Sequence, residues 1–275
     1  MQTSTLTTAD GLTLHVVQWL PVNAAPKAVV LIVHGIGEHS GRYAHVADYF
    51  TGRGFAVVAY DHRGHGKSGG ERTYFDSFDL PVADVRRVVE SVQTAFPALK
   101  LFVYGHSMGA LISTLYLLRY PDGIAGFISS GTPLTLEATQ PAPLVMVGKA
   151  LSRVIPKVRF AAVEVSALSR DLTVVADYQS DPLVDSQPVR LGMVARLLTA
   201  ATGAQSQLQR LTLPLLILHG DADRVCPPSG SELLYARAAS ADKTLHLYPG
   251  LYHEMHNEPE QQTVLADIAV WMESH

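Results

Sequence analysis

One short stretch of the chain carries the pattern of an activated serine. Gly105-His106-Ser107-Met108-Gly109 fits G-x-S-x-G and lies between an apolar run, Leu101–Tyr104, and a helical pattern that begins near Met108. In such a strand–turn–helix context the serine sits on a sharp turn, where its hydroxyl can attack a carbonyl. The N-terminus of the following helix favours negative charge that develops there. The motif predicts that Ser107 is a nucleophile; the alternative is a glycine-rich turn with an incidental serine.

A serine hydroxyl needs a base to take its proton, and the base needs an orienting acid. Asp221-Ala222-Asp223 follows the predicted strand Leu213–Leu218, and His253 follows the next predicted strand, Thr244–Tyr248. Serine, then acid, then histidine is the chain order expected with a serine on this kind of turn. The pattern predicts His253 as the base and leaves Asp223 or Asp221 as the acid.

Other histidines compete with His253 for the role of base. His246 lies inside the last predicted strand and is expected to pack there, and His275 is terminal. His256 follows His253 by three residues and could line the same site. His253-Glu254-Met255-His256 departs from H-E-x-x-H, and no other histidines have metal-ligand spacing, so we expect no metal site.

Two backbone N–H groups are predicted to hold the oxyanion of the reaction. One belongs to Met108, directly after the serine, and the other to Ile36, in the loop His34–Glu38 that follows an early apolar run. Two glycine-rich segments are close to nucleotide-binding motifs but do not complete them. Gly35-x-Gly37-x-x-Ser40 has serine in place of the third glycine of the dinucleotide motif, and the segment that ends in Gly66-Lys67-Ser68 has Asp61 in place of the first glycine of a phosphate loop. We therefore expect no cofactor.

The elements around these residues predict an α/β fold with a mostly parallel sheet flanked by helices. Short continuous apolar runs are typical of strands that are covered on both faces. Val82, Val85, Val88, Val89 and Val92 repeat at helical spacing between two such runs. An alternating segment, residues 12–17, follows an Asp-Gly turn and predicts an antiparallel hairpin at the start. The runs are Ala28–Val33, Phe55–Tyr60, Leu101–Tyr104, Gly126–Ser129 and Leu213–Leu218.

The alternation breaks between residues 132 and 209, where no strand is predicted and prolines are frequent. We expect a helical cap there, inserted late in a core formed by residues 1–131 and 210–275. Within it, Pro141–Phe160 combines many aliphatic residues with four basic and no acidic ones. Such a segment either packs on the main domain with its basic groups in water or lies on an anionic membrane surface.

Composition excludes several classes of protein. Of 275 residues 47% are hydrophobic and 17% charged, the formal net charge is −4, and there is one cysteine, Cys226. This balance does not suit a nucleic-acid partner, and one cysteine cannot form an internal disulfide. The longest uncharged run, between Lys100 and Arg119, holds too many polar residues for a membrane span. The first ten residues lack the regions of a signal peptide, so we expect a soluble, cytoplasmic protein.

Six segments of the chain carry one combined pattern. They are His34-Gly-Ile-Gly-Glu-His-Ser-Gly-Arg-Tyr43, Asp61-His-Arg-Gly-His-Gly-Lys-Ser68, Gly105-His-Ser-Met-Gly109, Ser180-Asp-Pro-Leu183, Asp223-Arg-Val-Cys226 and Tyr252-His-Glu-Met-His256. Taken together, they resemble the monoglyceride lipase branch of the α/β-hydrolases, related to bacterial lysophospholipases and of the serine aminopeptidase S33 type. The resemblance extends over nearly the whole chain and is far more specific than G-x-S-x-G alone.

The resemblance implies a carboxylic ester hydrolase that cleaves monoacylglycerols to glycerol and fatty acid. It implies a triad of Ser107, Asp223 and His253, with Asp221 as a loop-capping acid. It also implies a glycerol-binding end lined by four polar residues, namely Glu38, Arg42, Tyr178 and His256. On their own, Glu38 and Arg42 would be a surface ion pair and Tyr178 ordinary cap packing.

The expected partner is a monoacylglycerol or similar lipid ester, and the aliphatic cap would form a tunnel for its acyl chain and contact membranes peripherally.

Three other functions stay open. A lysophospholipase would need positive charge for a phosphate, and a prolyl aminopeptidase would need an acidic anchor for an amino terminus. A non-catalytic binding protein is disfavoured by the intact triad. Cys226 is expected to be a small buried residue.

Overall fold

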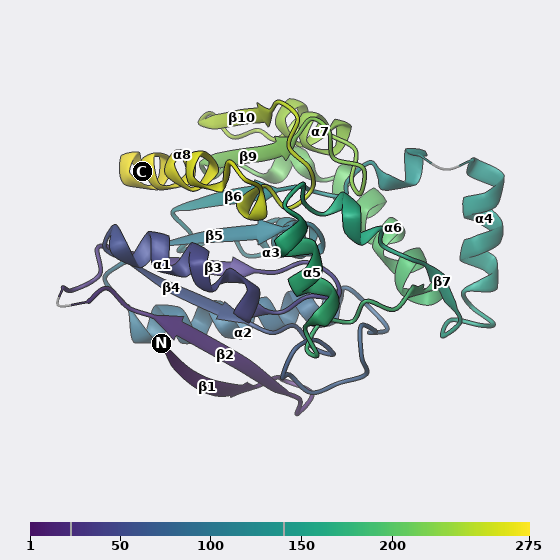
Figure 1. Cartoon of the computed structure of the whole chain (residues 1–275), viewed down its shortest axis with the longest axis horizontal. Coiled ribbons are helices and arrows are strands. Elements are labelled where there is room, and N and C mark those ends of the chain that lie inside the picture. Colours follow the sequence, from purple (N-terminus) through teal and green to yellow (C-terminus); the bar gives the residue numbers. More distant parts are fainter. Residues whose placement is uncertain (23, 140) are drawn as a thin grey trace.

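Eight strands form one sheet in the computed structural model, which describes residues 1–22, 24–139 and 141–275 (Figure 1). Their order across the sheet is β1-β2-β4-β3-β5-β6-β9-β10. The pairs β1–β2 and β2–β4 are antiparallel, and all later neighbours run parallel, which confirms the predicted mostly parallel sheet. The strands are β1 (Gln2–Thr7), β2 (Thr13–Trp19), β3 (Ala28–Val33), β4 (Phe55–Tyr60), β5 (Lys100–His106), β6 (Gly126–Ser130), β9 (Leu215–Gly220) and β10 (Lys243–Tyr248).

The continuous apolar runs become strands because both faces of the sheet are covered by helices. In β3, Val29, Leu31 and Val33 pack in one apolar cluster with α2 (Asp79–Ala95), α3 (Met108–Leu117) and α7 (Ser229–Arg237). The alternate residues Val30 and Ile32 pack in a second cluster with α1 (Ala44–Gly52) and α8 (Gln261–Ser274). Since every residue of β3 is buried, its sequence shows no polar alternation.

The edge strand β10 departs from one expectation. Its residues are only partly buried, and the His246 side chain is 42% exposed, so the expectation that this histidine packs inside the strand was wrong. β10 has a single neighbour, β9, and therefore less cover than the inner strands. The uncharged run from Leu101 to Leu118 forms β5 and α3, both buried in the core. Among the described residues no helix combines the length and apolarity that crossing a bilayer requires.

Between β6 and β9 the chain leaves the sheet and forms mostly helices, beyond the ends of the strands (Figure 1). Two short strands, β7 (Arg159–Ala161) and β8 (Val189–Arg190), pair antiparallel there, so the expectation of no strand in this stretch was wrong. Strands this short carry no alternation that a sequence pattern could show. The helices are α4 (Ala142–Leu151), α5 (Leu172–Ser180) and α6 (Leu191–Gln205). Division of the chain at residues 132 and 209 stays a prediction.

Five 3-10 turns complete the described elements. Two of them flank the predicted site: η1 leads from the His34–Glu38 loop into α1, and η5 follows His253. The turns are η1 (Ser40–Tyr43), η2 (Leu136–Thr139), η3 (Val165–Ala167), η4 (Leu208–Arg210) and η5 (Met255–Asn257).

Candidate active site

Ser107 occupies a sharp turn between β5 and α3. Its backbone angles, φ 53° and ψ −122°, are strained for a residue with a side chain. The Ser107 N–H donates to the Ser130 carbonyl of β6 over 2.8 Å, which holds the turn. A Cβ added at Gly109 would lie 2.0 Å from the Val33 carbonyl oxygen, so α3 can approach β3 this closely only with glycine there. The turn predicted from G-x-S-x-G is therefore present.

His253 and Asp223 form a buried pair at the ends of β10 and β9. The two side chains approach to 2.7 Å between His253 Nδ1 and Asp223 Oδ2. Asp223 Oδ1 also accepts hydrogen bonds from the N–H groups of Val225 (2.7 Å) and Cys226 (2.9 Å). Because Nδ1 is bound to the carboxylate, Nε2 is the ring nitrogen left for the serine. The arrangement brings an acid, a base and a hydroxyl together in the predicted chain order.

The charges in this pair support each other. Burial opposes ionisation of Asp223, but the facing charge of His253 and the histidine N–H groups around the carboxylate outweigh it and hold the pKa of Asp223 well below its usual value. Burial likewise disfavours the imidazolium of His253, and the charge of Asp223 outweighs that, so the pKa of His253 is raised. The pair can thus accept a proton from a nearby hydroxyl and keep it until a leaving group takes it.

Geometry distinguishes the acid that faces His253 from its neighbours. Asp221 Oδ1 accepts a 2.6 Å hydrogen bond from the Gly250 N–H and so joins two loops, whereas Asp223 contacts the histidine. The terminal His275, which competed with His253 for the role of base, contacts a different acid: its Nε2 lies 2.8 Å from Asp242 Oδ2. Among the described residues no group of three His, Cys, Asp or Glu side chains could hold a metal ion.

The loop with Ile36 passes close to the serine. A Cβ added at Gly35 would lie 3.3 Å from Ser107 Cβ. The loop is held by Glu38, whose Oε1 accepts from the Gly35 N–H over 2.6 Å. In the part of the chain that the structure describes, the N–H groups of Ile36 and Met108 donate to no protein acceptor. Both are therefore available to an oxygen that develops negative charge beside Ser107.

Three of the four residues predicted at the glycerol end lie together, in a buried ionic cluster. Arg42 donates to Glu38 Oε2 over 2.8 Å, and its guanidinium stacks on the Tyr178 ring at 4.7 Å. Arg42 also binds both oxygens of Glu254, each at 2.7 Å. All three charged side chains are at most 9% exposed, so the surface ion pair considered for Glu38 and Arg42 was wrong.

His256 lies behind this cluster. Its ring stacks on Tyr43 at 4.8 Å, and the Tyr43 hydroxyl donates to Glu38 over 2.9 Å. The imidazole is fully buried, and its Nε2 has no hydrogen-bond partner among the described groups. Burial is the main cause that lowers the pKa of His256 to about 3, so the ring is neutral near pH 7.

Glu254 is the member of the cluster that sequence reasoning missed. Burial acts to raise the pKa of both Glu38 and Glu254. For Glu254 two contacts with Arg42 outweigh burial and hold the pKa well below its usual value. For Glu38 burial outweighs Arg42, and the pKa remains raised. The signal was present in His253-Glu-Met-His256, where the acid directly follows the predicted base. That acid could have been paired with Arg42, the basic residue of η1.

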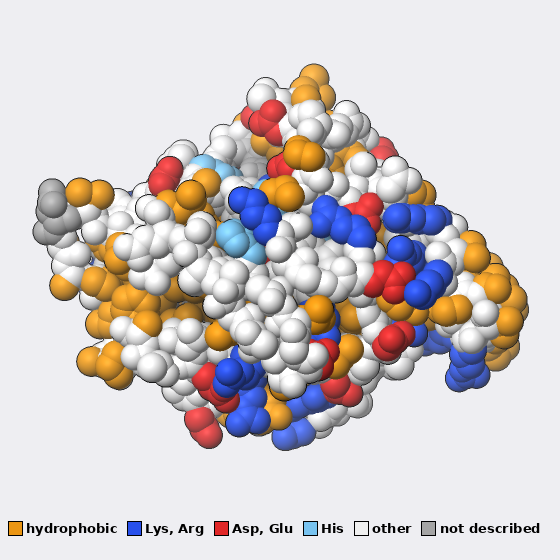
Figure 2. All heavy atoms as spheres, turned by 90° about the horizontal axis from the view of Figure 1, so that it is seen from below, with side chains coloured by type: hydrophobic (Ala, Val, Ile, Leu, Met, Phe, Trp, Pro, Cys, Tyr) orange, Lys and Arg blue, Asp and Glu red, His pale blue; other side chains and the backbone are white. Residues whose placement is uncertain are grey.

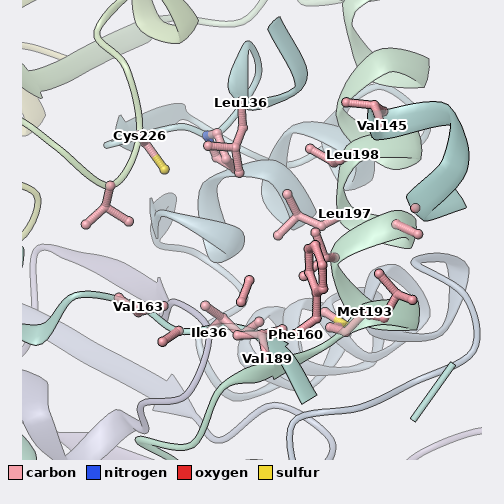
Figure 3. A pocket seen from close by; sticks show the side chains of 18 of the residues that line it. Ile36, Leu136, Val145, Phe160, Val163, Val189, Met193, Leu197, Leu198 and Cys226 are labelled. Carbon is pink, nitrogen blue, oxygen red and sulfur yellow. The ribbon is translucent and has the colours of Figure 1, made fainter. Parts of the chain in front are cut away.

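An apolar cavity of about 540 Å³ opens at Ser107 (Figure 3). This volume lies within the range of about 300–1,000 Å³ common for small-molecule sites. Its wall combines residues such as Ile36 and Cys226 with residues of the segment between β6 and β9, from α4, α6, β7 and β8. The labelled side chains in Figure 3 are Ile36, Leu136, Val145, Phe160, Val163, Val189, Met193, Leu197, Leu198 and Cys226.

Cys226 is buried in the acid loop beside Ser107. Burial and the charge of Asp223 raise the pKa of its thiol well above the ordinary value, against a smaller opposing effect of the Ser107 side chain. A thiol of this kind stays protonated at neutral pH and is a poor nucleophile. The expectation of a small buried residue is confirmed.

Comparison with known proteins adds to this geometry. Residues 24–260 match the family described as serine aminopeptidase, S33. The chain is 41% identical to a monoacylglycerol lipase of Mycolicibacterium smegmatis, covering 94% of this chain and 91% of that protein. It is 39% identical to human monoglyceride lipase, covering 97% and 89%. The crystal structure of Paleococcus ferrophilus monoacylglycerol lipase superposes with a TM-score of 0.84 at 31% identity, covering 95% and 99%.

Proposed function

The chain belongs to the serine aminopeptidase S33 family, and on that premise we propose that it cleaves monoacylglycerols to glycerol and a fatty acid, with Ser107, His253 and Asp223 as catalytic residues. The observation that carries this proposal is the position of Ser107, on a strained turn at the wall of an apolar cavity. A cavity of this kind suits an acyl chain and places its ester at the hydroxyl.

In the proposed reaction His253 Nε2 takes the proton of Ser107 as Oγ attacks the ester carbonyl. The N–H groups of Ile36 and Met108 bind the oxyanion, each contributing about 3 kcal/mol. The protonated His253, stabilised by Asp223, then gives its proton to the glycerol oxygen as the ester bond breaks. Water attacks the acyl-enzyme by the same route, His253 taking its proton and returning it to Ser107, and the fatty acid leaves.

The glycerol end is assigned to Glu38, Arg42, Tyr178 and His256. A carboxylate, a guanidinium, a phenol and an imidazole supply the donors and acceptors that glycerol hydroxyls need. Support comes from Tyr178, whose hydroxyl lies near Gly37, in the loop that carries Ile36. Glu38 braces the same loop through the Gly35 N–H.

We also propose that the enzyme works in the cytoplasm. Its cap would contact an anionic membrane peripherally. On and after α4, apolar side chains are exposed, with Met146 at 69%, Val154 at 80% and Phe160 at 57%. Lys and Arg side chains lie among apolar ones at the end of the molecule that holds α4 (Figure 2). Apolar and basic side chains on one face favour a surface of anionic lipid headgroups. Sedimentation with phosphatidylserine vesicles, compared with phosphatidylcholine alone, measures this contact.

A panel of monoacylglycerols of several chain lengths, with di- and triacylglycerols beside them, tests the main proposal. We expect turnover of monoacylglycerols by the wild type and none by Ser107→Ala, with fluorophosphonate labelling of the wild type only. Failure of the wild type on every monoacylglycerol would overturn the substrate. Lysophosphatidylcholine belongs in the panel because Arg224, whose side chain is 50% exposed, lines the cavity beside the acid.

A further inference from the structure

A second histidine, His219, lies against the catalytic acid and has no part in the mechanism above. It is the fifth residue of β9 and is fully buried. Its Nε2 lies 3.1 Å from Asp223 Oδ2, the same oxygen that accepts from His253. Nε2 also lies 3.0 Å from the Cys226 carbonyl oxygen, in the loop that carries Asp223. One ring nitrogen therefore contacts both the carboxylate and the loop that holds it.

The neighbours of His219 decide where its proton lies. A carbonyl and a carboxylate only accept hydrogen bonds, so Nε2 must carry the proton and donate to the Cys226 carbonyl. The other nitrogen, Nδ1, lies 2.7 Å from the hydroxyl of Ser231 on α7. With the proton on Nε2, Nδ1 can accept from that hydroxyl, so both ring nitrogens of His219 have a partner. Strand β9 and helix α7 thus hold an N–H dipole against Asp223.

We propose that His219 is a positioning residue that fixes the Asp223 carboxylate and limits its pull on the proton of His253. This rests on the proposed function, since it assigns a task within that triad. The N–H of His219 stabilises negative charge on Oδ2, and an oxygen that is already stabilised holds an imidazolium less strongly. Besides Asp223, the charged and titratable groups around His253 are Glu254, Glu38, His106 and His256, and none of them contacts His219 in the described structure.

The test is a set of variants assayed with a monoacylglycerol that the wild type cleaves. In His219→Leu the N–H is gone, so we expect kcat to fall about tenfold at unchanged KM. The acid limb of kcat/KM should move up by about half a pH unit, because Asp223 then holds the His253 proton more strongly. His219→Gln keeps an N–H donor and should restore both values towards the wild type. His246→Leu, on the neighbouring strand, is the matched control and should keep the wild-type profile.

Ser231→Ala tests the same contact without changing a core histidine. Without the hydroxyl, Nδ1 loses its donor and the ring is less polarised, so Nε2–H should hold Asp223 less strongly and the acid limb should move up by less than in His219→Leu. If His219→Leu does not fold, Ser231→Ala decides the question. An acid limb that stays at the wild-type pH in both variants, or in Ser231→Ala alone where His219→Leu does not fold, would overturn the proposal. An inactive wild type would instead overturn the proposed function, so the two failures are distinguishable.

Discussion

Replacing Arg42 with leucine should destabilise the protein strongly, because two buried carboxylates would lose their cation. The side chains of Arg42, Glu38 and Glu254 are 9%, 3% and 3% exposed, and the guanidinium contacts the acids at 2.7–2.8 Å. Removing one partner of such a buried pair costs about 3–5 kcal/mol. At an unfolding entropy of about 2.1 cal/mol/K per residue, a loss of about 4 kcal/mol lowers Tm by about 7 °C in a 275-residue chain.

The loss should depend on pH, and its sign follows from Glu254. Its pKa is held below the ordinary value of 4.5 when folded, because Arg42 outweighs burial. A depressed carboxyl pKa stabilises the fold above about pH 4.5, and this contribution disappears as the pH falls through the folded pKa. Without Arg42, burial raises the pKa of Glu254. At low pH the carboxylate then becomes protonated, and the protein no longer buries an unpaired charge there. The deficit of Arg42→Leu should be larger at pH 7.5 than at pH 5.

Urea denaturation at both pH values, with the m-value fitted each time, measures this deficit. Arg86→Leu is the matched control, because Arg86 pairs with Glu90 on an exposed helix face and should cost less than about 0.5 kcal/mol. The double variant Arg42→Leu/Glu254→Gln should recover part of the loss, since it removes one unpaired charge. A deficit below about 1 kcal/mol, or one that is equal at both pH values, would refute this account of the cluster.

Three further outcomes follow from the geometry around the serine. Ser107→Gly should raise the free energy of unfolding by about 1 kcal/mol while abolishing turnover, because glycine tolerates φ 53°; urea denaturation checks this, and a less stable variant contradicts the strain. Gly109→Ala should lower the melting temperature through a loss of about 3 kcal/mol or more, because its Cβ would lie 2.0 Å from the Val33 carbonyl; an unchanged thermal scan contradicts it. In the pH–rate profile, the acid limb of kcat/KM should lie above pH 6.5, because Asp223 raises the pKa of His253 even though burial opposes this. Only the neutral imidazole can take the serine proton, so kcat/KM rises as His253 loses its own proton. An acid limb at or below pH 6.5 contradicts this prediction.

The fold was predictable where the sequence carries a strong local pattern. Ala28–Val33 and Phe55–Tyr60 coincide with β3 and β4, because strands buried on both faces leave uninterrupted apolar runs. Residues 13–17 lie in β2, which pairs antiparallel with β1 in the predicted hairpin. The strands β7 and β8 escaped prediction, since two or three residues cannot show a period.

The site was predictable in its residue types more than in its contacts. Ser107 was predicted from a motif, and Asp223 and His253 from their places after two predicted strands. Together with their order along the chain, this was enough to group the three residues in one site. Chain order left Asp223 or Asp221 as the acid and the resemblance implied Asp223, which is also the one that contacts His253. The burial of Glu38 and Arg42 depends on Glu254, more than two hundred residues along the chain from Arg42, and no local pattern records such a partner.

The route of the chain between β6 and β9 has a consequence for how this protein could diversify. These two strands are neighbours in the sheet, and Ser130 pairs with Leu218, so the insertion leaves and returns at adjacent points. Closing a longer loop between fixed ends costs only about 0.6 kcal/mol for each doubling of its length. The proposed catalytic residues follow strands of the sheet, whereas most of the cavity wall belongs to the insertion. Evolution or engineering can therefore exchange the segment that lines the cavity and leave the strand ends in place.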